Sequence, residues 1–119
     1  MKNISETELE IMNVIWEHNK AVTVKDIQDL LSDNGWKTTT VQTFMNRLSE
    51  KGYLRVEKIN RSNYYTAAIN RSEYSVFETK KIITNVHSGS IRNFVASLVD
   101  GDSLTASEIS ELKAWLNKK

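Results

Sequence analysis

The sequence predicts a mainly α-helical fold in two parts, with one short β-hairpin between three N-terminal helices and three C-terminal helices. Apolar residues recur at helical spacing before residue 52 and again after residue 70. Between these positions the spacing changes to every second residue, which is typical of strands. The 119 residues include no proline and only four glycines, so little in the chain interrupts a helix.

The first two helices are predicted from their caps and apolar stripes. Ser5-Glu6-Thr7-Glu8 has the S-x-x-E form of a capping box, and the helix behind it ends near residues 18 and 19. Residues 21 and 22 form a brief extended stretch, after which Thr23 caps a second helix that ends at Asn34-Gly35. The inward-facing residues are Leu9, Met12, Ile15 and Trp16 in the first helix and Val24, Ile27, Leu30 and Leu31 in the second.

The third helix lies within KTTTVQTFMNRLSEKGYL, residues 37 to 54. We expect the three successive threonines to cap its start, because threonine crowds a helix interior but caps a helix well. Its apolar face comprises Val41, Phe44, Met45 and Leu48. Its opposite face comprises Thr39, Thr40, Gln42, Thr43, Asn46, Arg47 and Glu50. Most of these side chains can form hydrogen bonds and few are charged, which favours contact with a partner over an ordinary solvated face.

Two strand-like segments follow Gly52, at residues 53–58 and 63–68, with the turn-prone Ile59-Asn60-Arg61-Ser62 between them. Three short helices followed by a hairpin with a basic tip is the order of a winged helix-turn-helix. We therefore predict a winged helix-turn-helix DNA-binding domain over residues 1–69, with the hairpin as its wing. A generic small α+β domain is the alternative.

Residues 70–119 are predicted to form a three-helix dimerisation region. We expect helices at about 71–86, at 91–99 and after the capping box Thr105-Ala106-Ser107-Glu108. Three short amphipathic helices can barely enclose a core alone, so their apolar faces are expected to pack against a second copy of the chain. The predicted dimerisation residues are Phe77, Ile83, Val86, Ile91, Phe94, Val95, Leu98, Ile109, Leu112, Trp115 and Leu116.

The net charge of +1 hides a segregation along the chain. Residues 1–36 carry a net charge of −4, residues 37–61 carry +4 and the remainder carries +1. A polyanion responds to such local potential and not to the whole-chain average. The basic segment favours a nucleic-acid partner, although a solvated basic patch fits the charge alone equally well.

In a helix-turn-helix, the second helix of the pair lies in the DNA major groove with its N-terminal half towards the base edges. Hydroxyl and amide side chains contact bases, and Gln can bond adenine through two hydrogen bonds. Cations further along suit phosphates, which supply salt-sensitive affinity without sequence preference. The predicted DNA-binding residues are Thr39, Thr40, Gln42, Thr43 and Asn46 for bases, and Arg47, Lys51, Arg55, Lys58 and Arg61 for the backbone.

No catalytic or metal site is predicted. The chain has no cysteine, its two histidines (His18 and His87) lie in different segments, and it contains no G-x-S-x-G, phosphate-loop or H-E-x-x-H motif. We therefore expect neither enzymatic activity nor a cofactor. No apolar run is long enough to span a bilayer and the acidic N-terminus lacks a signal-peptide pattern, so a cytoplasmic location without membrane association is expected.

These residues resemble the penicillinase repressor family, the BlaI/MecI/CopY transcriptional repressors of Gram-positive bacteria. The resemblance rests on SETELEIMNVIW at the start, WKTTTVQTFMNRLSEKGYL in the middle and YYTA before the last helices, and it continues to LTASEISELKAWLNKK. The T-V-x-T-x-x-x-R-L-x-x-K-G core, Thr40 to Gly52, is moderately specific alone and strong together with the I-M-x-x-I-W start.

The resemblance implies a homodimer that places a winged helix on each half-site of a palindromic operator, usually of TACA/TGTA type. It also implies release by an inducing signal. Relatives that control antibiotic resistance are inactivated by proteolysis in the dimerisation region after a membrane sensor detects a β-lactam. A sensor-linked protease is then an expected partner, beside operator DNA and the second copy. Copper-responsive relatives carry a C-terminal cysteine cluster, and this chain has no cysteine.

The chain departs from the family pattern in cleavage and in base recognition. The family's scissile bond is an Asn-Phe pair, whose place is taken by Ser97-Leu98 in a collinear alignment. An Asn93-Phe94 pair lies one helical turn earlier and is a candidate cleavage site, although Phe94 also fits the apolar stripe as a core residue. Gln42 stands where several relatives have a basic residue, so half-site preference is expected to differ in detail.

Other interpretations stay open from the residues alone. The winged helix could serve as a protein-interaction module whose basic hairpin docks an acidic partner, or it could bind DNA without sequence preference. A ligand-sensing regulator would need an enclosed pocket, and the sequence contains no polar cluster committed to one.

Overall fold

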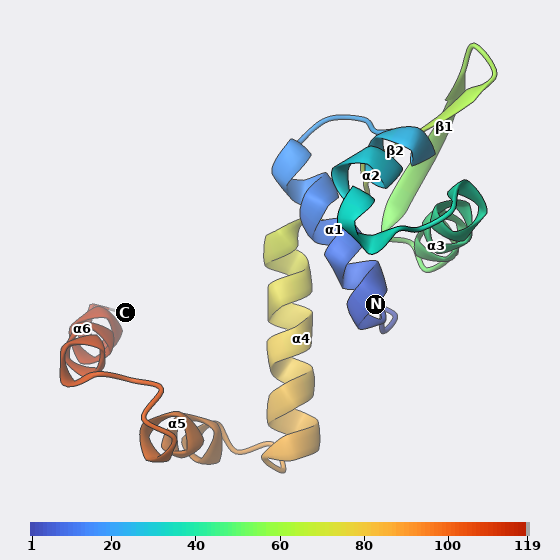
Figure 1. Cartoon of the computed structure of the whole chain (residues 1–119). Coiled ribbons are helices and arrows are strands. Elements are labelled where there is room, and N and C mark those ends of the chain that lie inside the picture. The colour runs from blue at the N-terminus through green and yellow to red at the C-terminus, as the bar shows by residue number, and fades with distance from the viewer. Residues whose placement is uncertain (119) are drawn as a thin grey trace. The chain divides into compact units, whose positions relative to one another are not determined.

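The computed structural model describes residues 1–118. Its contacts divide the chain into two compact units, which we call unit 1 (Met1–Phe77) and unit 2 (Glu78–Lys119). The elements are α1 Glu6–His18, α2 Val24–Leu30, the 3₁₀ turn η1 Ser32–Asn34, α3 Thr38–Glu50, β1 Leu54–Ile59, β2 Ser62–Ala67, α4 Arg71–Val86, α5 Ile91–Asp100 and α6 Ala106–Asn117. All of them except η1 are labelled in Figure 1.

Helix α1 begins at the predicted capping box. The Ser5 hydroxyl accepts the Glu8 backbone N–H at 3.1 Å, and the Ser5 N–H donates to the Glu8 carboxylate at 2.8 Å. The helix ends at Asn19, which takes the left-handed conformation at φ 51°. Ile11, Met12 and Ile15 are buried on its inner face.

Helix α2 is shorter than predicted. Thr23 caps it as expected, through a reciprocal pair of hydrogen bonds with Asp26. The helix ends at Leu30, and the turn η1 carries the chain on to Gly35, which has a positive φ of 65°. The inward placement of Leu30 is wrong, because the helix stops there after two turns and leaves the side chain 47% exposed. Ile27 alone of this helix is fully buried.

Helix α3 starts differently from the prediction. The cap position belongs to Lys37 and no side chain caps the helix, so the expected threonine cap is wrong. The threonines lie inside the first turn instead, where the Thr38 hydroxyl donates to the Gln28 side-chain oxygen at 2.8 Å. The apolar face is confirmed: Val41, Met45 and Leu48 are buried, and Phe44 is half-buried against Trp36 with ring centroids 5.5 Å apart.

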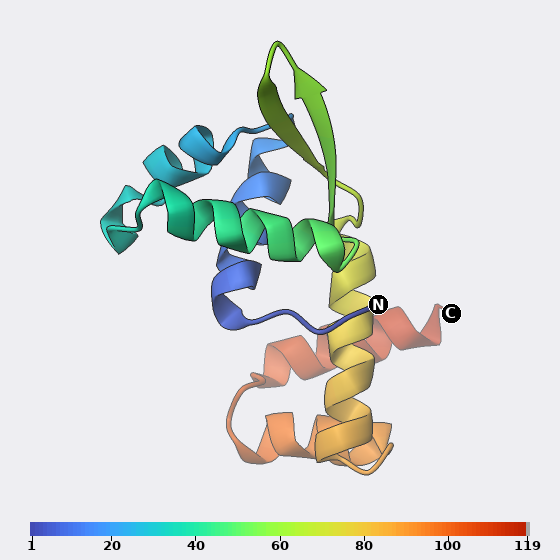
Figure 2. The same ribbon diagram turned by 90° about the vertical axis from the view of Figure 1, so that its right-hand side faces the viewer.

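Strands β1 and β2 form an antiparallel hairpin, which we call the wing. Its register pairs Leu54 with Ala67 at the base and Ile59 with Ser62 at the tip. The turn is a two-residue one, tighter than predicted, and both Asn60 and Arg61 have positive φ, as in the type I′ turns that match strand twist. The wing projects from the helices of unit 1 (Figures 1 and 2).

The order helix, helix, helix, hairpin in unit 1 confirms the winged helix-turn-helix. Its core also takes in the start of α4, where Tyr74 is buried with its ring 5.8 Å from Trp16 and 6.0 Å from Tyr53. Phe77, one of the predicted dimerisation residues, packs partly against this same core. Unit 1 therefore continues past residue 69 into the first two turns of α4.

Unit 2 comprises the rest of α4 with α5 and α6. Ser90 caps α5, and the predicted capping box of Thr105 and Glu108 begins α6. No residue from 78 to 118 is fully buried. Exposed large apolar side chains are Ile82, Val86, Ile91, Val99, Leu112, Trp115 and Leu116.

A bilayer-spanning helix would have to be both long and apolar, and none of the helices within residues 1–118 meets that description.

Candidate nucleic-acid interface

The outward face of α3 carries the side chains predicted to contact bases. Thr39, Thr43, Asn46 and Arg47 are exposed, while Thr40 and Gln42 are half-buried. The Thr43 hydroxyl donates to the Thr39 carbonyl at 3.0 Å, which leaves its oxygen and its methyl group for a partner. The face is therefore rich in hydrogen-bonding groups and carries little charge.

Gln42 is held from two sides. Its Nε2 donates to Asn46 Oδ1 at 2.9 Å and to the Tyr65 hydroxyl at 3.0 Å. Tyr65 lies on β2 and is 1% exposed, so the wing contacts the predicted base-reading face of α3 through this hydroxyl. The sequence analysis missed Tyr65. Strand alternation identifies Tyr64 and Tyr65 as facing opposite ways, but it cannot say which hydroxyl meets α3.

A second set of hydrogen bonds fixes α3 against α2. Gln28 on α2 accepts from the Thr38 hydroxyl at 2.8 Å, and its amide nitrogen donates to the Trp36 carbonyl at 3.1 Å. One side chain thus ties the turn before α3 to the first turn of α3. The angle between the two helices of the helix-turn-helix depends on this link and on the apolar contacts beneath it.

Arg47 and Lys51, both predicted to contact the DNA backbone, lie in different surroundings. Arg47 is exposed, with its guanidinium 6.0 Å from the Phe44 ring. The Lys51 ammonium instead bonds both carboxylate oxygens of Glu8, at 2.8 and 3.1 Å, and Glu8 is 3% exposed. The charge of Lys51 is thus largely compensated by α1.

Glu8 is ionised in these surroundings for identifiable reasons. Burial alone would raise the pKa of its carboxyl group, since it disfavours the charged form. The hydrogen bonds from Lys51 and Ser5, together with the positive charge of Lys51, outweigh burial and hold the pKa below its usual value. The pair therefore stabilises unit 1 by joining the start of α1 to the end of α3.

The wing carries three predicted phosphate contacts, which do not share one face. Side chains alternate along a strand, so Lys58 lies on the face of Tyr65 and Val56, and Arg55 lies on the other face. Arg61 is at the tip, in the two-residue turn. Within residues 1–118, neither these three cations nor Arg47 forms an ion pair. Their charges are therefore available to an anionic partner.

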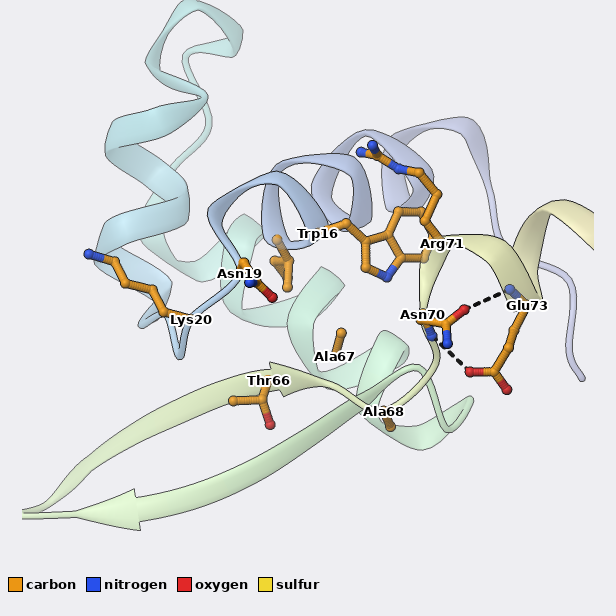
Figure 3. Close-up of a pocket in the computed structure, with 10 residues that line it drawn as sticks. Trp16, Asn19, Lys20, Thr66, Ala67, Ala68, Asn70, Arg71 and Glu73 are labelled. Carbon is orange, nitrogen blue, oxygen red and sulfur yellow. Dashed lines mark hydrogen bonds between the residues drawn. The ribbon is translucent and has the colours of Figure 1, made fainter.

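A hollow lies elsewhere in unit 1, at the end of α1, the end of β2 and the start of α4 (Figure 3). It measures about 540 Å³ and is open to solvent. Some of its polar groups already form hydrogen bonds: the Trp16 indole N–H donates to the Ile69 carbonyl, and Asn70 and Glu73 cap each other. Among the residues described there, we find no set of converging free polar groups of the kind that fixes a small ligand.

No cluster of three or more His, Asp or Glu side chains suitable for a metal ion occurs within residues 1–118.

Comparison with known proteins gives a consistent picture. The family model described as "Penicillinase repressor" matches residues 4–118. The chain is 34% identical to the penicillinase repressor of Bacillus licheniformis over 109 residues, covering 92% of this chain and 85% of that one. It is 31% identical to the methicillin resistance regulatory protein MecI of Staphylococcus aureus strain N315, covering 98% and 94% of the two chains.

Solved structures agree with these matches. The DNA-binding domain of the repressor BlaI is 38% identical with a TM-score of 0.53, covering 62% of this chain and 94% of that domain. BlaI of Bacillus licheniformis has also been solved as a monomer in complex with the blaP half-operator. That structure is 38% identical with a TM-score of 0.51, covering 61% and 89% of the two chains. The reduced form of MarR of Escherichia coli is 16% identical with a TM-score of 0.51, covering 97% and 76%, which shows a shared fold.

Proposed function

The chain belongs to the penicillinase repressor family, a family of transcriptional repressors, and from that premise we propose that it is a homodimer that binds a palindromic operator sequence-specifically. Helix α3 enters the major groove and reads bases with Thr39, Thr40, Gln42, Thr43 and Asn46. Arg47 and the wing cations Arg55, Lys58 and Arg61 contact phosphates. Half-sites of TACA/TGTA type are expected from the family.

The observation that carries this proposal is the outward face of α3, which is polar and mostly neutral and is flanked by unpaired cations on α3 and the wing. Neutral hydroxyl and amide groups suit base edges, while unpaired cations suit the phosphate backbone. A 38% identical relative, BlaI, has been solved with its half-operator. Lys51 contributes mainly through its ion pair with Glu8 in this proposal, since its ammonium is already bonded.

The dimer is supported by unit 2. Its exposed apolar side chains include Ile91, Trp115 and Leu116, which are costly to leave in water. A second copy would bury them. Two linked winged helices bind two half-sites far more tightly than separate ones, because the second contact becomes intramolecular.

Release by an inducing signal follows from the same arrangement. Separation of the dimer would remove the linked binding and free the promoter. Cleavage within α5 is one route, at Asn93-Phe94 or at Ser97-Leu98. Both bonds lie inside the helix Ile91–Asp100, and Phe94 packs edge-on against His87 with ring centroids 5.5 Å apart. A protease that needs an extended substrate must therefore first unwind α5.

N-terminal sequencing of fragments from induced cells would identify the cleaved bond, and a chain that stays intact during induction would contradict cleavage.

A mobility-shift titration tests DNA binding and dimerisation together. The probes are a duplex that carries TACA and TGTA half-sites as an inverted repeat and a duplex of the same composition with both half-sites scrambled, each in excess random competitor. We expect a discrete complex of two chains per duplex on the first probe alone. Equal binding to both probes would contradict sequence-specific repression and favour a non-specific DNA binder. If the random competitor abolished binding to both probes, the search should turn to protein partners.

A further inference from the structure

The hydrogen bonds around Gln42 carry a consequence for base recognition, which rests on the proposed function. Gln42 Nε2 has two hydrogens, and both are used, one by Asn46 Oδ1 and one by the Tyr65 hydroxyl. A bidentate contact with adenine needs one amide N–H for N7 and the amide oxygen for the N6 amine. Gln42 as held here can offer only its oxygen.

Tyr65 is a rigid anchor for this arrangement. Its backbone pairs with Val56 of β1 on one side, and on the other side it exchanges two hydrogen bonds with Val22, at 2.7 and 2.9 Å. Its ring is buried, so packing fixes the position of the hydroxyl. A side chain fixed by packing on both sides holds the groups that it bonds in one orientation.

We propose that Tyr65 is a positioning residue for base recognition: its hydroxyl holds Gln42 so that Gln42 presents an acceptor and Asn46 presents a donor to the bases. Asn46 Oδ1 accepts from Gln42, which turns the Nδ2 group of Asn46 into its available donor. Tyr65 itself does not contact DNA in this proposal. The wing thereby sets the hydrogen-bonding polarity of α3, that is, which of the two side chains offers an acceptor and which offers a donor to the bases.

This polarity predicts which base atoms are preferred. The Gln42 oxygen accepts from an exocyclic amine, which adenine and cytosine offer in the major groove. The Asn46 nitrogen donates to an acceptor such as guanine O6 or N7 or thymine O4. The two residues are four positions apart on the helix, an axial rise of about 6 Å, and base pairs stack about 3.4 Å apart. The amide groups lie closer together than this rise, since Gln42 Nε2 is 2.9 Å from Asn46 Oδ1. The pair therefore reads neighbouring base pairs within one half-site.

The test is selection of binding sites by the full-length chain from a random duplex library, followed by sequencing of the bound fraction. Tyr65→Phe removes only the hydroxyl and keeps the buried ring. We expect it to weaken the preference at the base pairs read by Gln42 and Asn46 by about threefold to tenfold, as loss of one hydrogen bond does, and to leave the other positions and the affinity for random duplex unchanged. Tyr64→Phe is the matched control, since it removes a hydroxyl from the neighbouring residue on the opposite face of β2.

A double-variant comparison separates positioning from a general effect on the fold. In a Gln42→Met background, Tyr65→Phe should have no further effect on base preference, because it acts through Gln42. Unchanged preferences in Tyr65→Phe, or equal losses at every position, would overturn the positioning role while the proposed repressor stands. A wild-type chain that enriches no motif would overturn both. Thermal melting of each variant verifies that the fold is retained.

Discussion

Units 1 and 2 are both built from short amphipathic helices, but only unit 1 buries their apolar side chains. The buried apolar residues of the described chain all lie between Ile11 and Tyr74. In unit 2 none of the described apolar side chains is fully buried, and Trp115 is 54% exposed. The hairpin accounts for part of the difference, because its strands add the buried side chains of Leu54 and Tyr65 to the core of unit 1.

We expect the stability of the two units to depend differently on chain concentration. A unit with its own core unfolds at a temperature set by its own contacts. A unit that completes its core by association gains stability by mass action, so its melting temperature rises with chain concentration. We therefore expect the melting temperature of unit 1 to be independent of whether unit 2 is self-associated.

The largest expected effect is on self-association. Trp115→Asp places a charge on the exposed apolar face of α6 and should weaken dimerisation by about a hundredfold or more. A few large aromatic side chains usually supply most of the binding free energy of an interface. Sedimentation of the full-length chain over a concentration series measures it. Ser110→Asp is the matched control, because it adds the same charge on the other side of the same helix. A dimer that survives Trp115→Asp unchanged would show that α6 lies outside the interface.

The next effect concerns the ion pair within unit 1. Lys51→Met leaves the buried Glu8 carboxylate without its cation and should lower the free energy of unfolding by about 2 kcal/mol, less than for a fully buried pair because the lysine is partly exposed. Thermal melting measures it, and Arg47→Ala is the control, since the exposed Arg47 forms no ion pair in the described chain. A stable Lys51→Met protein with weakened DNA binding would instead identify Lys51 as a phosphate contact.

The same pair gives a pH dependence of known sign. The pKa of Glu8 is lowered in the folded chain, so its stabilisation is fully present above the unfolded value of about 4.3. It is lost as pH falls through the folded pKa. In Lys51→Met the buried carboxylate protonates more readily, so the stability gap between the variant and the unsubstituted chain should narrow as pH falls from 7 towards 4. A gap that stays constant over this range would contradict the pairing.

A smaller effect is expected at Arg47. Arg47→Ala removes one exposed cation beside the base-reading face and should weaken binding to operator and random duplexes alike, by about fivefold to tenfold at moderate salt. Titrations on both duplexes at several salt concentrations measure the affinity and its salt slope, which should fall by about 0.9. A loss confined to the operator would mean that Arg47 reads a base.

How far the sequence predicts the molecule depends on how local the determining contacts are. Ser5, Thr23 and Thr105 were predicted as caps and confirmed, because a capping box is completed within three residues. The winged-helix order was also confirmed, since it follows from spacing along the chain. The family, which was predicted from the resemblance of the sequence motifs, was confirmed as well.

Contacts between distant residues account for the rest. Glu8 and Lys51 are 43 positions apart, and Gln42 and Tyr65 are 23 apart. Periodicity fixes which face of an element each residue occupies, but not which residue of another element it meets. The same limit explains why the predicted threonine cap was wrong, because the hydroxyl of Thr38 donates to Gln28 on α2 and not to a group of its own helix. The DNA-binding and dimerisation residues stay predictions.

The smallest expected effect separates the two faces of the wing. Lys58 lies on the face of Tyr65, whose hydroxyl contacts α3, whereas Arg55 lies on the opposite face. We therefore expect a duplex bound by α3 to approach Lys58 more closely than Arg55. We expect Lys58→Gln to weaken binding about threefold and Arg55→Gln by less than about twofold at the same salt, each measured by titration on one operator duplex. Both changes remove one charge from the same strand, so unequal losses of affinity would reflect the positions of the two side chains and not the change in net charge. A larger loss from Arg55→Gln would mean that the wing meets DNA with its other face, and the contact between Tyr65 and α3 would then stabilise the wing without orienting it towards the groove.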